Sequence, residues 1–116
     1  ATRVAGRIGK MAEKLNVNII GVIENMSYYI CPECGHKEYL FGQSGGKKLA
    51  DALKTDLLAE LPLQLSLRKA GDEGRLYLFE EPEAELSQSY LTIADKIIDK
   101  VKEFDPDIKP MTMKQK

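Results

Sequence analysis

The fold is decided by residues 17–23, whose sequence is Val17-Asn18-Ile19-Ile20-Gly21-Val22-Ile23. This segment is almost continuously apolar and rich in β-branched residues. Such a run is typical of a strand that is covered on both faces in a parallel sheet. We therefore expect a buried central strand over residues 17–23.

Regular patterns lie on both sides of this strand. Before it, apolar residues at helical spacing predict an amphipathic helix over residues 2–15. After it, Ser44 can cap a helix that runs to about Lys54, and residues 57–61 have the pattern of a second strand, closed by Pro62. Strand, helix and strand at this spacing form the βαβ unit of a parallel sheet, so we expect an α/β fold.

Two further helices are expected, one over residues 65–70 and a long one over residues 82–104. Two strands and these helices would form an incomplete core, because a parallel strand needs neighbours at both edges and helices on both faces. The chain also begins without Met, directly inside a helical pattern. We therefore expect a fragment of a larger domain, followed by a flexible polar tail over residues 105–116.

Composition limits the classes of protein to consider. The chain has 116 residues, enough for at most one small domain, and its 17 basic and 18 acidic residues give a net charge of −1. This balance predicts neither a nucleic-acid partner nor an anionic membrane surface. No apolar stretch approaches the roughly 20 residues that span a bilayer, and no signal-peptide pattern is present. We expect a cytoplasmic protein with reduced thiols.

The strongest chemical motif is Cys31-Pro32-Glu33-Cys34-Gly35, at the tip of a hairpin expected over residues 28–41 with aromatic arms. Two thiolates at this spacing can bind one metal centre, while the glycine lets backbone N–H groups approach the sulfurs. Two ligands do not complete a zinc or iron-sulfur site, and His36 is too close to Cys34 to add a third. A two-fold homodimer would supply four thiolates, Cys31 and Cys34 from each chain.

Several interpretations of the cysteine pair remain open. Spacing alone does not separate a shared zinc ion, in a zinc-stabilised dimeric interaction module, from a shared [4Fe-4S] cluster. A thiol oxidoreductase is less favoured, because a thioredoxin-like C-x-x-C requires a strand-to-helix setting. A buried, inert pair is least favoured, because this turn exposes both sulfurs on one side. His36, the only histidine, is expected to be a surface polar residue.

Two other positions invite a nucleotide interpretation. The segment from Gly42 to Lys48 resembles a phosphate loop, but three residues rather than four separate Gly42 from Gly46, and Lys48 replaces the Ser or Thr. A helix start eased by glycine is the better interpretation. Asn25 follows the apolar run, at the end of a strand where open α/β sheets bind ligands, although composition alone favours a turn-forming Asn that closes the strand.

Taken together, several segments strongly resemble the Mrp/ApbC family of iron-sulfur cluster carrier ATPases, which are MinD-like P-loop NTPases. The resemblance extends over about residues 4–80 in unbroken order. The segments that carry it are Gly21-Val22-Ile23-Glu24-Asn25-Met26-Ser27-Tyr28, Cys31-Pro32-Glu33-Cys34-Gly35, Tyr39-Leu40-Phe41-Gly42, Gly45-Gly46-Lys47-Lys48-Leu49-Ala50, Leu61-Pro62-Leu63 and Arg68-Lys69-Ala70-Gly71-Asp72-Glu73-Gly74.

The resemblance implies that residues 1–104 are the carboxyl-terminal half of a MinD-like P-loop ATPase domain. It implies a [4Fe-4S] cluster held between two subunits by Cys31 and Cys34 and passed to apo iron-sulfur proteins, which favours a cluster over zinc. It also implies that Asn25 contacts the adenine of ATP, with Pro62 and Leu63 as weaker companions.

The chain departs from the family in what it lacks. The amino-terminal half, with its Walker A loop, switch segments and Mg²⁺-binding aspartate, has no counterpart here. That half is therefore an expected partner, and the chain alone should not hydrolyse ATP. Two smaller departures are Gln64, where an acidic residue is common, and Leu76, where a proline often follows Gly-Arg. We expect neither to touch the proposed ligands.

Overall fold

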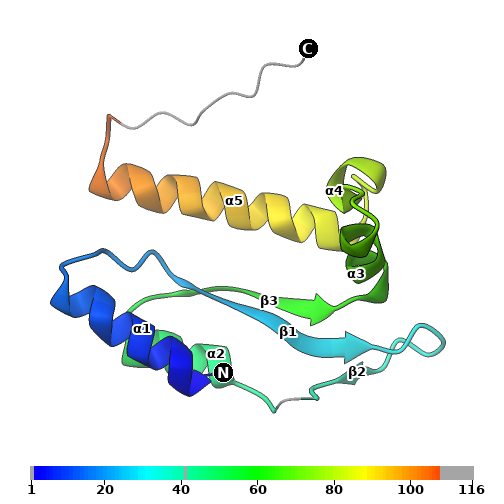
Figure 1. The fold of residues 1–116 in the computed structure, drawn as a ribbon, viewed down its shortest axis with the longest axis horizontal. Coiled ribbons are helices and arrows are strands. Elements are labelled where there is room, and N and C mark those ends of the chain that lie inside the picture. The colour runs from blue at the N-terminus through cyan, green and yellow to red at the C-terminus, as the bar shows by residue number, and fades with distance from the viewer. Residues whose placement is uncertain (1, 41, 108–116) are drawn as a thin grey trace.

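The computed structural model describes residues 2–40 and 42–107 (Figure 1). Its elements are α1 (Thr2–Lys14), β1 (Val22–Ile30), β2 (Lys37–Glu38), α2 (Gly45–Ala52), β3 (Leu57–Leu63), α3 (Leu65–Asp72), α4 (Tyr77–Glu80) and α5 (Glu85–Phe104). None of these helices combines the length and apolarity that a bilayer crossing requires.

The sheet has three strands in the order β2-β1-β3. β1 and β3 are parallel and joined through α2, whereas β2 returns antiparallel to the end of β1. This arrangement is the βαβ unit that the spacing predicts, extended by a short hairpin. The α/β class is confirmed.

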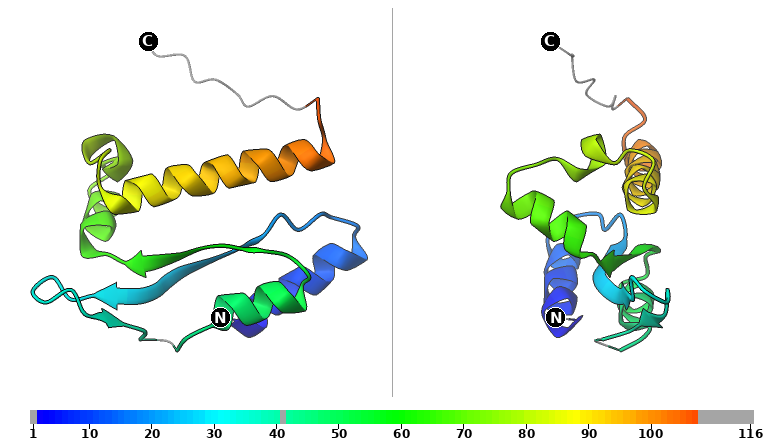
Figure 2. Two further views of the ribbon diagram at one scale, coloured as in Figure 1. Left: turned by 180° about the vertical axis from the view of Figure 1, so that it is seen from behind. Right: turned by 90° about the vertical axis from the view of Figure 1, so that its right-hand side faces the viewer.

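Helices cover the β1–β3 pair from two sides (Figures 1 and 2). α1 and α2 lie on one side, and α5 lies on the other with α3 and α4 at one of its ends. α1 packs against α2. The two approach closely at Gly9, where an added Cβ would lie 2.4 Å from Leu53 Cδ2. A glycine at this point therefore permits the two helices to pack.

The hydrophobic core lies between β3 and the α3–α5 side. Its buried members come from all four elements and are Leu61, Ala70, Tyr77, Leu86 and Ile93. Two lysines of α5 add polar ties to the β3 region: Lys96 Nζ donates to the Leu58 carbonyl at 2.9 Å, and Lys100 Nζ lies 2.7 Å from Asp56 Oδ2. α5 is thus fixed to β3 by both apolar burial and hydrogen bonds.

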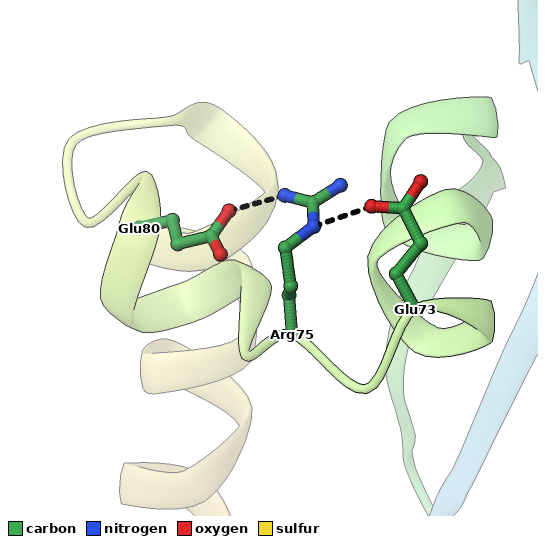
Figure 3. A network of polar contacts seen from close by, with 3 residues as sticks. All are labelled: Glu73, Arg75 and Glu80. Atoms are coloured by element: carbon green, nitrogen blue, oxygen red, sulfur yellow. Dashed lines mark hydrogen bonds and ion pairs between the residues drawn. The ribbon is translucent and has the colours of Figure 1, made fainter.

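The connection from α3 to α4 is held by one arginine (Figure 3). Arg75 Nε donates to Glu73 Oε2 at 2.7 Å, and its Nη1 donates to Glu80 Oε2 at 2.5 Å. These side chains are substantially exposed, so solvent screens each ion pair and its net contribution to stability is small. The network orients the connection between α3 and α4 but contributes little to its stability.

The central strand differs from expectation in place and burial. The ladder begins at Val22 and continues to Ile30, so residues 17–21 lie before it. Val17 is 57% exposed and Ile23 41% exposed, so the expected full burial of this segment is wrong for the described residues. The physical reason is that, among the described residues, β3 is the only strand paired with β1 until β2 pairs with its last two residues, so the other edge of β1 is open along most of its length.

Two boundaries and one helix cap also differ. Pro62 does not close β3 but lies inside it opposite Tyr28, as a proline can in a strand paired along one edge. Ser44 is the N-cap residue of α2, yet it is left-handed with φ 67° and makes no capping hydrogen bond through its side chain. α5 begins at Glu85 rather than Pro82, after a short α4 that the sequence pattern does not predict.

Candidate functional site

The two cysteines lie in the tight turn that joins β1 to β2. The backbone N–H of Cys31 donates to the carbonyl of His36, and the N–H of Gly35 donates to the carbonyl of Cys31, both at 2.9 Å. Gly35 has φ +75°, a conformation that glycine adopts without the strain of a Cβ. The turn is therefore closed by its own backbone, with both cysteines at its tip.

The hairpin arms are shorter than expected. Tyr29 pairs with Glu38 and Ile30 with Lys37, so the returning arm is Lys37–Glu38 rather than residues 39–41. Phe41 lies outside the described residues. Tyr39 instead packs beside the arm: its ring centroid is 5.8 Å from that of Tyr28.

Aromatic and cationic contacts brace the base of this hairpin. The Tyr28 and Tyr39 rings meet at an interplanar angle of 49°. Lys37 Nζ lies 4.8 Å from the centre of the Tyr28 ring, within the range of a cation–π contact. Tyr28, near the end of β1, thus contacts both Lys37 and Tyr39 of the segment that follows the cysteine turn.

The chemistry of the thiols suits metal ligation. Both cysteines are free, Cys34 is exposed and Cys31 is partly buried. The backbone N–H of Cys34 donates to the Cys31 sulfur, with smaller contributions from the N–H of Glu33 and the Cys34 thiol, and together these lower the pKa of the Cys31 thiol. Donors aimed at the sulfur favour the thiolate, which is the form that binds metals.

The cysteine pair is only part of a metal site. No group of three or more His, Cys, Asp or Glu side chains that could hold a metal ion occurs within residues 2–40 and 42–107. His36 directs Nε2 to Glu38 Oε2 at 2.9 Å, and both side chains are exposed, as a surface role predicts. One copy of the described chain therefore offers two thiols and no third ligand.

Asn25 lies in a bulge of β1. Glu24 pairs with Glu60 and Tyr28 with Pro62, so residues 25–27 stand opposite Leu61 alone. Asn25 is exposed, and its Oδ1 accepts a 2.9 Å hydrogen bond from the N–H of Met26, a residue with φ +52°. The side chain thus supports the bulge that presents it at the surface.

Glu24, one residue before the bulge, has a buried Oε2 with no hydrogen-bond partner among the described residues. It lies against the start of α2, where a Cβ built on Gly46 would come within 2.9 Å of that oxygen. The glycine therefore allows α2 to pack over the Glu24 side chain. The apolar run in the sequence predicts that Glu24 lies at the end of a strand, but the sequence pattern does not predict its contact with Gly46.

A cleft of about 370 Å³ adjoins the cysteine turn. Tyr29, Ile30 and Pro32 line it on the hairpin side, and residues 62–66 line it on the side of the β3–α3 turn. The structure thus brings Pro62 and Leu63 together with the base of the hairpin. Asn25 does not line this cleft and lies at the neighbouring bulge instead.

Gln64 is a residue to which the sequence pattern assigns no role. It lines the cleft, and its Nε2 lies 2.8 Å from Ser66 Oγ and 3.0 Å from the Tyr77 hydroxyl. Because Tyr77 belongs to the hydrophobic core, Gln64 joins the wall of the cleft to that core. Its departure from the family pattern is the one signal that could have drawn attention to it.

Comparison with known proteins places these features in a family. A family model described as ParA, NUBPL iron-transfer P-loop NTPase, matches residues 1–98. The iron-sulfur cluster transfer protein NUBPL of Mus musculus is 40% identical over 93 residues, covering 80% of this chain and 29% of the mouse protein. The iron-sulfur cluster carrier protein of Escherichia coli K12 is 42% identical over 87 residues, covering 75% of this chain and 24% of the bacterial protein.

A solved structure agrees with the sequence relatives. It is a nucleotide-binding protein from Archaeoglobus fulgidus in complex with ADP, in which cobalt was found, and it matches with a TM-score of 0.58 and 34% identity. The match covers 74% of this chain and 34% of that protein. The chain thus spans about a quarter to a third of the length of these relatives. Its match over nearly all the described residues shows that the chain belongs to the ParA family of NUBPL-type iron-transfer P-loop NTPases, as the resemblance to Mrp/ApbC proteins predicts.

Proposed function

We propose that this chain is the cluster-binding part of an iron-sulfur cluster carrier. Its cargo is a [4Fe-4S] cluster held between two copies, with Cys31 and Cys34 of each copy as ligands, and the cluster passes to apo iron-sulfur proteins. The observation that carries the proposal is a pair of adjacent free thiols with no third ligand in the described residues. The names of the mouse and bacterial relatives support the same cargo.

The local chemistry fits a cargo that must be held and then released. Backbone N–H donors near Cys31 stabilise thiolate charge, and hydrogen bonds to sulfur also tune a bound cluster. Cys34 is exposed at the tip of the turn, so an acceptor protein can approach the ligand from solvent. Two-fold symmetry makes the two turns equivalent and brings the thiolates to four.

The nucleotide part of the proposal concerns the longer protein. ATP with Mg²⁺ would bind to the amino-terminal P-loop half, while Asn25, Pro62 and Leu63 contribute the contacts to adenine. The ADP bound to the relative from Archaeoglobus fulgidus supports a nucleotide site in the family. We assign residues 1–104 to the ATPase domain, residues 105–116 to a tail, and the cytoplasm as the location.

A shared zinc ion is the second candidate, because four thiolates from two chains suit tetrahedral zinc equally well. In that case the chain would be a zinc-stabilised dimeric interaction module. The two candidates differ in colour, sulfide content and reaction with acceptor proteins. One reconstitution experiment therefore separates them.

The test uses the full-length protein, reconstituted anaerobically with ferrous iron and sulfide. We expect visible absorption and about four iron atoms and four sulfides per two chains, as a shared [4Fe-4S] cluster requires. Cys31→Ser and Cys34→Ser should each lose most of the iron, whereas the control His36→Ala, two residues from Cys34, should keep it. A protein that stays colourless while it takes up zinc tightly would favour the second candidate, and undiminished iron in both cysteine variants would refute the shared site.

A further inference from the structure

The backbone of the cysteine turn brings its two cysteines close together within one copy of the chain. The N–H of Gly35 donates to the carbonyl of Cys31, so the turn is closed by a hydrogen bond that spans four residues. One turn of a helix is closed in the same way, and there the first and fourth Cα atoms lie about 5 Å apart. Disulfides join residues whose Cα atoms are about 4.4–6.8 Å apart. The turn therefore has the backbone separation that a disulfide between Cys31 and Cys34 requires.

The side chains of the two cysteines agree with this backbone. The N–H and the thiol of Cys34 are both hydrogen-bond neighbours of the Cys31 sulfur. Cys34 is exposed, so a small oxidant reaches it from solvent, and Cys31 is partly buried. The chain has no other cysteine, so a disulfide within one copy joins these two. The sulfurs thus lie within reach of one another and of solvent.

The shape of the turn does not depend on a bond between the sulfurs. At its base, the N–H of Cys31 donates to the His36 carbonyl at 2.9 Å. Near its tip, Gly35 adopts φ +75° without the strain of a Cβ. Because the thiol form already holds this shape, closing the disulfide ring orders little further chain. Preorganisation of this kind favours bond formation within one copy over bonds between copies.

We propose that Cys31 and Cys34 also form a reversible disulfide within one copy, and that this oxidation withdraws both cluster ligands at once. Sulfur binds metal as the thiolate, so a sulfur in a disulfide is lost as a ligand. The reduced turn binds a cluster and the oxidised turn does not. This inference rests on the proposed carrier function and deepens it, because it concerns the control of the same site.

Hydrogen peroxide is the oxidant for which the step is written. The Cys34 sulfur attacks one peroxide oxygen, the O–O bond breaks, and water leaves as the sulfur becomes a sulfenic acid. The Cys31 sulfur then attacks the Cys34 sulfur, so that the S–S bond forms and the S–OH bond breaks. The departing hydroxide takes the Cys31 proton and leaves as a second water. A dithiol reductant reverses the step by thiol–disulfide exchange and is itself oxidised.

The first experiment uses the full-length apo protein, treated without oxygen with one equivalent of hydrogen peroxide. We expect the chain to lose about 2 Da, the mass of two hydrogen atoms, and to give a peptide linked through Cys31 and Cys34. Zinc uptake, measured without reductant, should fall by at least about tenfold and return after dithiothreitol, because zinc needs both thiolates. Cys34→Ser should form no such bond, whereas His36→Ala keeps both thiols and should match wild type.

A second experiment tests whether the folded turn, rather than the spacing alone, favours the bond. The apo protein is equilibrated with reduced and oxidised glutathione, both native and in urea, and the disulfide fraction is measured by alkylation and mass spectrometry. We expect the native protein to favour the disulfide over the unfolded one by about tenfold, because the turn raises the effective concentration of one sulfur near the other. Gly35→Ala should lower this preference, whereas Gly71→Ala, equally open but in α3, should keep it.

The outcomes separate this inference from the function on which it rests. A reduced wild-type protein that takes up no cluster on reconstitution contradicts the proposed function. A reduced protein that loads cluster, but that forms only bonds between copies when treated with peroxide, overturns this inference alone. Equal disulfide fractions in the native and urea-unfolded protein also overturn it, as does undiminished zinc uptake by the oxidised protein.

Discussion

The helices α1 and α5 carry similar apolar stripes but differ in what covers them. On α5, Leu86 and Ile93 are each only 5% exposed, because β3, α3 and α4 pack against that face. On α1, Ile8 is 65% exposed and Leu15 67% exposed, because the helix contacts α2 through its glycine-bearing side. Periodicity thus identifies a helix and its apolar face, but burial depends on a neighbour that periodicity does not name.

Matched isoleucines give the largest expected difference between the two helices. Ile93→Ala should lower the free energy of unfolding of the chain by about 2–5 kcal/mol, because it leaves a cavity in the core. Ile8→Ala, at the exposed stripe, should change it by less than about 0.5 kcal/mol. Urea unfolding of the two variants measures both values. Equal losses would mean that α1 is buried in solution and that the contrast is wrong.

Matched glycines test how firmly α1 packs. Gly6→Ala should stabilise the chain by up to about 1 kcal/mol through helix propensity, since a Cβ there meets only Leu49 Cδ1 at 3.8 Å. Gly9→Ala should instead destabilise it by about 1 kcal/mol, because its Cβ would overlap Leu53. Thermal unfolding compares the pair. A gain at both positions would show that α1 is not held against α2.

The cysteine turn extends the comparison to a region held by backbone geometry rather than by burial. Gly35→Ala should cost about 1–2 kcal/mol, because the residue has φ +75° and no neighbour within 4 Å to relieve or worsen the strain. Gly71→Ala, equally open but inside α3, should be neutral or slightly stabilising. Urea unfolding gives the two changes, and amide exchange at residue 35 locates the first. A neutral Gly35→Ala would show that the turn does not require the left-handed conformation.

The smallest expected effect is a shift in thiol reactivity. The backbone N–H groups of Cys34 and Glu33 lower the pKa of the Cys31 thiol, so its reactive thiolate forms at a lower pH than in an unstructured peptide. In the apo protein, alkylation of Cys31 by iodoacetamide should therefore begin to rise below the ordinary thiol range. Mass spectrometry of the Cys31 peptide across pH measures the midpoint. The same midpoint in the native and urea-unfolded chain would contradict the proposed sulfur contacts.

Features set by local spacing could be predicted from the sequence. The βαβ unit follows from two apolar runs separated by a helical pattern, and the structure contains it as β1, α2 and β3. The cysteine turn follows from Cys31 and Cys34 at a spacing that brings two sulfurs together. The patterns that predict them, apolar periodicity and the cysteine spacing, involve neighbours within a few residues, which a single sequence displays directly.

Features set by pairing between distant segments could not be predicted. The apolar run suggests a strand from Val17, but β1 starts at Val22 because its register is fixed by β3, more than thirty residues later. The bulge at Asn25 arises from the same pairing. Gln64 meets Tyr77 through the packing of α3 and α4, and no periodic signal relates two residues that are thirteen positions apart. The assignments of Asn25, Pro62 and Leu63 to nucleotide therefore remain predictions.

The hydrogen bond from Lys96 to Leu58 also bears on how copies of this chain can associate. Leu58 is the extra residue in β3 between the pairs Val22–Leu57 and Ile23–Ala59, and its carbonyl is already taken by the ammonium group. An incoming strand that used the second lone pair of that carbonyl would have to approach the charged ammonium group of Lys96. Charged side chains at strand borders are a common protection against open-ended stacking of sheets into aggregates. Lys96 is therefore a feature that would oppose such stacking at Leu58.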